Sequence, residues 1–100
     1  MRKIIISKTA TKNALEIAEY IEVKFSRKFR NEFIEKVNKA FELIRSNPEI
    51  FPKSEINANR FRFVLTKQTT IYYRFNNSEI RILALFDTRQ NPKKIKKDSK

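Results

Sequence analysis

Residues 69–87 decide the fold: Thr69-Thr70-Ile71-Tyr72-Tyr73-Arg74-Phe75, then Asn76-Asn77-Ser78, then Glu79-Ile80-Arg81-Ile82-Leu83-Ala84-Leu85-Phe86-Asp87. Residues 69–75 alternate apolar and polar side chains, the period of a strand with one buried face. Residues 82–86 are apolar on both faces, which is typical of a strand inside a sheet. Because Asn tolerates positive φ best after Gly, we expect an Asn with positive φ to reverse this Gly-free chain at residues 76–78. The stretch predicts an antiparallel hairpin.

Two amphipathic helices and two further strands precede the hairpin. We expect residues 3–6, most of which are β-branched, to form a short strand. Residues 60–65, in which Arg and apolar side chains alternate, are expected to form a second strand. Ser7 or Thr9 caps the first helix and Ser26 the second, which ends near Ser46 because Asn47 precedes a proline. The buried stripes, at period 3.6, comprise Ala10, Ala14, Ile17, Ala18, Ile21 and Phe25 in the first helix, and Phe29, Phe33, Ile34, Val37, Phe41 and Ile44 in the second.

The element order β-α-α-β-β-β predicts an α+β fold. The short connection at Ser26 predicts an antiparallel helix hairpin packed on a small, mainly antiparallel sheet, with the first strand beside a later one. Residues 47–59 are expected to form a loop that places Ile50 and Phe51 against the core, and Phe75 is expected in the core as well. We expect a single domain over residues 1–92 and a basic, flexible tail over residues 93–100.

The composition narrows the classes of function. The 100 residues include 23 Lys and Arg against 11 Asp and Glu, a formal net charge of +12, which favours a polyanion or an acidic protein as partner. The chain has no His, Cys or Gly, so we expect no metal, no cofactor and no Gly-rich phosphate loop. No apolar run reaches transmembrane length, and the absence of Cys suits a reducing compartment. We therefore expect a cytoplasmic protein with no membrane partner.

Several strings occur in this order along the chain: Ser7-x-x-Ala10, Ile17-x-x-Tyr20-Ile21, Phe41-x-x-Ile44, Asn47-Pro48, Phe51-Pro52, Arg62, Ile71-Tyr72-Tyr73-Arg74, Ile80-x-Ile82-Leu83 and Phe86-Asp87-Thr88-Arg89-Gln90-Asn91-Pro92. Taken together, these strings resemble the RelE/ParE superfamily of bacterial toxins from type II toxin–antitoxin systems. The last string is closer to the ParE branch. The resemblance implies a cytoplasmic toxin neutralised by a cognate acidic antitoxin. The antitoxin would dock along the helix hairpin and bring carboxylates to the Arg residues of the sheet.

The two branches of the superfamily imply different targets. ParE-like toxins inhibit DNA gyrase, whereas RelE-like toxins cut messenger RNA on the ribosome with a set of basic residues and often a C-terminal Tyr. Arg60, Arg62 and Arg89 match part of that catalytic set. Thr70 stands where the third-strand Arg would be, and no Tyr follows Tyr73. These departures favour a gyrase inhibitor; the ribonuclease is the alternative, and a non-toxic basic nucleic-acid-binding module is a further one.

Four side chains are candidates for contact with the target or the antitoxin: Arg62, Tyr72, Arg74 and Arg89. If the strand register matches, the first three share a basic and aromatic face that can hold phosphates and stack bases. An ordinary solvent-exposed face fits the same pattern equally well. An ion pair with Asp87 is the structural alternative for Arg89. Because Arg stays protonated and His is absent, RNA cleavage would need a Lys or Asp87 as base, and a local structural role of Asp87 is favoured over a catalytic one.

Overall fold

The computed structural model describes residues 2–54 and 60–89. The elements follow one another as β1 (Lys3–Ile6), α1 (Lys8–Lys24), α2 (Arg27–Ser46), the short 3-10 helix η1 (Pro48–Ile50), β2 (Phe61–Val64), β3 (Thr69–Phe75) and β4 (Glu79–Asp87). This is the predicted α+β order, with η1 as an addition inside the predicted loop. The predicted tail over residues 93–100, and with it the domain boundary at residue 92, lies outside the described residues.

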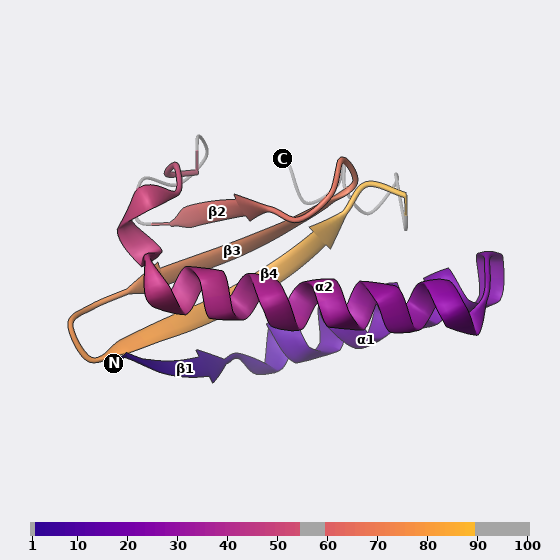
Figure 1. The fold of residues 1–100 in the computed structure, drawn as a ribbon, viewed down its shortest axis with the longest axis horizontal. Coiled ribbons are helices and arrows are strands. Elements are labelled where there is room, and N and C mark those ends of the chain that lie inside the picture. The colour runs from indigo at the N-terminus through magenta and orange to yellow at the C-terminus, as the bar shows by residue number, and fades with distance from the viewer. Residues whose placement is uncertain (1, 55–59, 90–100) are drawn as a thin grey trace.

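The strands form one mixed sheet in the order β1-β4-β3-β2, as Figure 1 shows. β1 lies parallel to β4, whereas β3 is antiparallel to both β4 and β2. The predictions that β4 is an interior strand and that β1 lies beside a later strand are confirmed. β1 pairs only with residues 79–82 of β4. Beyond that point the side chain of Asn13 in α1 accepts a hydrogen bond from the Leu85 backbone N–H at 3.1 Å. The helix thus supplies an acceptor for β4 where β1 has ended.

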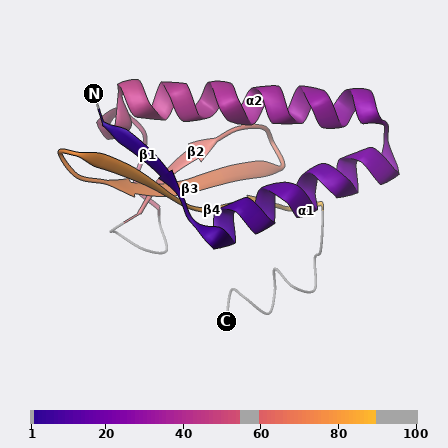
Figure 2. The same cartoon turned by 90° about the horizontal axis from the view of Figure 1, so that it is seen from below.

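Helices α1 and α2 form an antiparallel hairpin on one face of the sheet (Figure 2). Each helix begins at a predicted serine: Ser7 Oγ accepts from the Ala10 N–H at 3.0 Å, and Ser26 Oγ accepts from the Phe29 N–H at 3.1 Å. α2 ends at Ser46, where the predicted proline-induced boundary lies. Within the described part of the chain, no helix is long and apolar enough to cross a membrane.

The core lies between the helix hairpin and the sheet. Its buried apolar side chains are Ala10, Ile17, Ala18, Ile21, Phe33, Val37, Ala40, Ile44, Ile71, Tyr73, Ile80, Ile82 and Leu85, and Phe41, Phe51 and Phe75 pack against them. The Tyr73 hydroxyl, inside this core, donates a hydrogen bond to the Pro48 carbonyl oxygen at 2.7 Å. Burial, reinforced by the charge of Glu49, raises the pKa of Tyr73, so the phenol stays protonated and keeps η1 fixed to β3.

Four side chains predicted to be buried are exposed. Phe25 and Phe29 are 55% and 52% exposed, because the helix hairpin projects past the sheet at the α1–α2 junction (Figures 1 and 2). Their rings instead pack edge to face, with centroids 6.1 Å apart. Ile34 lies at the margin of the α2 stripe and is 36% exposed. Ile50 is 66% exposed, because η1 buries Pro48 in its place.

A side chain, not a positive φ, closes the β3–β4 hairpin. No residue in ranges 2–54 and 60–89 has positive φ, so that prediction for the Asn turn is wrong. Asn76 Oδ1 accepts hydrogen bonds from the Ser78 and Glu79 backbone N–H groups, each at 2.9 Å. The Asn76 N–H donates to the Glu79 carbonyl oxygen at 3.0 Å. The amide of Asn76 thus supplies the turn geometry that glycine supplies elsewhere.

The two adjacent tyrosines of β3 provide a matched test of the core. Tyr73→Phe leaves the buried Pro48 carbonyl oxygen without its donor, and we expect it to lower the free energy of unfolding by about 1–2 kcal/mol. Tyr72→Phe removes a hydroxyl on the opposite face of the sheet and is expected to change that free energy by less than about 0.5 kcal/mol. Urea unfolding followed by circular dichroism measures both values. Equal losses in the two variants would contradict the assignment.

Candidate functional site

The candidate residues lie on two opposite faces of the sheet. Residues of β3 alternate, with Ile71 and Tyr73 buried toward the helices, so Tyr72 and Arg74 face the other way. Arg62 of β2 lies directly opposite Tyr72 in the antiparallel register. The predicted grouping of Arg62, Tyr72 and Arg74 on one face is therefore present. We call this side of the sheet, turned away from the helices, the outer face.

The outer face also contains a basic residue that the sequence reasoning missed. Arg81 of β4 is paired with Arg74 in the β3–β4 register and is exposed. Its Nε donates to Glu79 Oε1 at 2.7 Å. The alternation of buried Ile80 and Ile82 around Arg81 is the signal that identifies it from the sequence. Arg60 is exposed and stands one residue before β2.

Two of these guanidinium groups have no acceptor in the described part of the chain. No hydrogen bond or ion pair joins the side chain of Arg62 or Arg74 to another described residue, and Arg62 Nε is enclosed without a partner. A phosphate or carboxylate oxygen that reaches these side chains meets donors that are not already engaged. Such an anion would form charge-assisted hydrogen bonds, which are about twice as strong as neutral ones.

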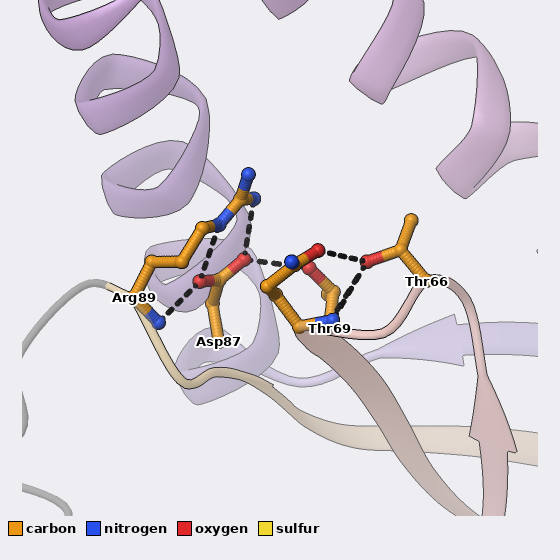
Figure 3. Close-up of polar contacts among 5 residues, drawn as sticks. Thr66, Thr69, Asp87 and Arg89 are labelled. Carbon is orange, nitrogen blue, oxygen red and sulfur yellow. Dashed lines mark hydrogen bonds and ion pairs between the residues drawn. The ribbon is translucent and has the colours of Figure 1, made fainter.

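Arg89 lies on the helix side of the sheet, where it is bound to Asp87 (Figure 3). Arg89 Nη2 donates to Asp87 Oδ2 at 2.9 Å, and Arg89 Nε donates to Asp87 Oδ1 at 3.1 Å. The Arg89 backbone N–H also donates to Oδ1, at 2.9 Å. Thr69 completes the set: its hydroxyl donates to Oδ2 at 2.6 Å from the neighbouring strand. The carboxylate is fully enclosed, whereas the Arg89 side chain is 30% exposed.

The turn before β3 holds this cluster in place. Thr66 Oγ1 accepts hydrogen bonds from the Gln68 and Thr69 backbone N–H groups at 3.2 and 3.1 Å. Residues 69 and 87 are direct partners in the β3–β4 register, which brings the Thr69 hydroxyl to the carboxylate. The arrangement is therefore built by the sheet and its turn, and it fixes the direction in which Arg89 points (Figure 3).

The electrostatics of the pair follow from these contacts. Burial alone raises the pKa of Asp87, but the hydrogen bonds from Arg89 and Thr69 and the charge of Arg89 together hold that pKa below its usual value. The hydrogen bonding of the Arg89 guanidinium to Asp87, in which Arg89 donates, is also the main cause of the raised pKa of Arg89, against the opposing effect of burial. Both groups are charged at neutral pH. An enclosed carboxylate in this state is a partner for Arg89 and is poorly placed to accept a substrate proton.

A groove of about 330 Å³ lies beside Arg89 at the projecting end of the helix hairpin. Its walls combine helix and turn residues, and its lining, which we call the hairpin groove, comprises Ile21, Phe25, Phe29, Glu32, Phe33, Lys36, Thr66, Gln68 and Arg89. Apolar rings thus stand next to one guanidinium. Among residues 2–54 and 60–89, no group of acidic residues is placed to hold a metal ion. The groove is chemically suited to a ligand that has both apolar and acidic side chains.

Comparison with known proteins identifies similar chains. The sequence model of the family described as "ParE toxin of type II toxin-antitoxin system, parDE" matches residues 4–92. A solved structure of the chromosomal ParDE system of P. aeruginosa is 14% identical, with a TM-score of 0.75 over 87% of this chain and 96% of that one. A search of curated protein sequences finds no match.

Two further solved structures share the fold at lower similarity. One chain of the E. coli DinJ–YafQ complex is 10% identical, with a TM-score of 0.60 over 89% of this chain and 96% of that one. The YoeB/ParE toxin of Agrobacterium tumefaciens is 14% identical, with a TM-score of 0.57 over 85% of this chain and 97% of that one. At these identities the structures establish the fold, and the family assignment comes from the sequence model.

The Asp87–Arg89 pair makes stability depend on pH. At pH 7 we expect Asp87→Asn to lower the free energy of unfolding by about 2 kcal/mol, because hydrogen bonds to a charged group are lost. Glu79→Gln, which breaks the more exposed pair with Arg81, is the control and should cost less than about 1 kcal/mol.

The sign of the pH effect follows from the lowered pKa in the folded state. The stabilisation is complete above the ordinary carboxyl pKa of 3.8 and is lost as pH falls through the lower folded value. The difference between the wild type and Asp87→Asn should therefore shrink below about pH 4. Urea unfolding at a series of pH values measures it. A difference that stays constant down to the acid limit would show that the ionised carboxylate is not what stabilises the fold.

Proposed function

Because the chain belongs to the ParE toxin family of type II toxin–antitoxin systems, we propose that it inhibits DNA gyrase in the cytoplasm until a cognate acidic antitoxin neutralises it. The observation that carries this proposal is the family match over residues 4–92, which spans the elements from β1 to β4. The ParE branch is the one whose resemblance implies gyrase as the target. The strongly basic composition suits an acidic neutralising partner.

The placement of the arginines supports gyrase inhibition over RNA cleavage. The ribonuclease alternative needs Arg60, Arg62 and Arg89 around one phosphate. Arg62 lies on the outer face, whereas Arg89 is bound to Asp87 on the helix side. The chain also has no His to move a proton at neutral pH. In this arrangement the basic residues can bind anions separately, but they do not converge on one reacting atom.

The hairpin groove supports an antitoxin that is both acidic and apolar. Phe25 and Phe29 expose large rings that a folding antitoxin segment can cover, and aromatic anchors of this kind carry much of the binding energy of interfaces. The exposed part of the Arg89 guanidinium offers a positive group beside them to an antitoxin carboxylate. Among the similar structures, one is of a ParDE system and one is of a DinJ–YafQ complex. For this chain we propose an equivalent partner, docked in the hairpin groove.

Gyrase inhibition is tested directly with purified protein. We expect the toxin to inhibit supercoiling of relaxed plasmid by gyrase, and the antitoxin from the adjacent reading frame to reverse the inhibition. In parallel, messenger RNA 5′ ends are mapped after induction of the toxin without its antitoxin. Inhibited supercoiling with intact messages is the expected result. New 5′ ends within translated frames, with supercoiling unaffected, would instead establish the ribonuclease alternative.

Antitoxin docking is tested with two exposed apolar residues of α2. We expect Phe29→Ala to weaken antitoxin binding by about tenfold or more, since it removes an aromatic anchor from the hairpin groove. Leu43→Ala is the matched control, because Leu43 is 54% exposed on the same helix and does not line the groove. Isothermal titration calorimetry with the full antitoxin measures both. An equal effect of the two substitutions would place the antitoxin elsewhere.

A further inference from the structure

We propose that the outer face of the sheet binds single-stranded DNA, with its arginines on the phosphates and its aromatic rings on the bases. The strand register brings these charged and aromatic residues together on the side away from the helices: Lys3 of β1, Arg62 of β2, Tyr72 and Arg74 of β3, and Glu79, Arg81 and Phe86 of β4. The choice of DNA over RNA rests on the proposed action on gyrase. The face itself is inferred from register, charge and exposure.

The charge of the outer face is strongly one-sided. Four cationic side chains share the face with one carboxylate, Glu79, which is bound to Arg81. Arg62 and Arg74 have no acceptor among the described residues, so their charges are not compensated within that part of the protein. Arg74 and Arg81 are cross-strand partners. Like charges at such a position destabilise a sheet, and a bound polyanion removes that cost.

The aromatic residues stand among these cations. Tyr72 lies opposite Arg62, and its half-buried ring has no place in the core cluster. Phe86 is opposite Thr70, so it is a diagonal neighbour of Tyr72 at a separation of about 7–8 Å. Rings at two positions allow two bases of an extended strand to stack, while the adjacent arginines hold the backbone. Duplex DNA keeps its bases stacked inside the helix and cannot use these rings.

The outer face is physically distinct from the hairpin groove. The groove lies on the helix side, next to Arg89 and the Phe25–Phe29 pair. Arg62, Tyr72 and Arg74 take no part in its lining. Changes on the outer face can therefore be made without altering the surface proposed for the antitoxin, which separates the two binding functions in experiments.

Fluorescence anisotropy of a labelled single-stranded DNA oligonucleotide of mixed sequence tests the proposal on the full-length toxin. We expect the double variant Arg62→Gln with Arg74→Gln to weaken binding about tenfold or more and to reduce the slope of log K against log salt by about 1.4. Tyr72→Leu should weaken binding about fivefold or more with an unchanged slope, because it removes stacking and no charge.

The matched control removes the same charge from another surface. Arg27 and Lys28 are exposed at the start of α2, and their double replacement by Gln should weaken binding by no more than about twofold, since distant charges are screened. Circular dichroism verifies the fold of each variant. If Arg62→Gln unfolds the protein, Arg74→Gln with Arg81→Gln replaces it, because both of these side chains are exposed.

Each possible outcome decides the proposal. Loss of affinity on the outer face but not in the control, with DNA bound at least as tightly as RNA of the same sequence, supports it. No binding by the wild type, equal losses in both double variants, or tighter binding of RNA or duplex DNA overturns it. A supercoiling assay on the same preparations keeps the two proposals apart. Gyrase inhibition without oligonucleotide binding overturns only this inference, and the reverse result overturns only the proposed target.

Discussion

The antiparallel register of β3 against β4 is the constraint on which the rest of the structure depends. It turns Ile71 and Tyr73 toward the helices and leaves Tyr72 and Arg74 on the outer face. It also sets Thr69 opposite Asp87, which fixes the carboxylate that holds Arg89. A slip of one residue would move every side chain to the other face of its strand. Core, outer face and groove therefore all derive from one pairing.

The element order was predictable from the sequence because each helix and strand carries its own period and its own end signal. Ser7, Ser26 and Pro48 mark boundaries through local chemistry that needs no tertiary information. The exposure of Phe25 and Phe29 was not predictable in this way. Ser7 Oγ donates to the Leu83 carbonyl oxygen, so α1 begins beside the middle of β4. Its 17 residues extend about 26 Å, farther than the rest of β4 can cover. An apolar stripe shows which side of a helix can be buried, but it does not show how far along the helix the sheet extends to cover that side.

The sequence predicts which site residues share a face when they lie on the same strand. It does not predict which residues of neighbouring strands join them, because that depends on how the strands pair. Tyr72 and Arg74 share a face by alternation within one strand. Placing Arg62 and Arg81 on the same face as these two residues requires the registers of β2 and β4 against β3. Those registers depend on turn geometry and on a bulge between Tyr72 and Tyr73. The direction of Arg89 depends on its bonds to Asp87 after the strand has ended. The sequence shows the charge and the aromatic character of these residues, but which of them lie on the same face is determined by how the strands pair in the sheet.

The polar side chains that close the turns have a consequence for the unfolded protein. At three turns of the described chain a side-chain oxygen accepts a hydrogen bond from a backbone N–H group, namely that of Ser26, Thr66 or Asn76. The sequence contains no glycine at all. A chain without glycine samples fewer backbone conformations when unfolded, and each glycine avoided at a compatible position is worth about 0.4–1 kcal/mol of stability. The toxin therefore loses less conformational entropy when it folds. This contribution to stability arises in the unfolded state, so it cannot be seen among the contacts of the native structure.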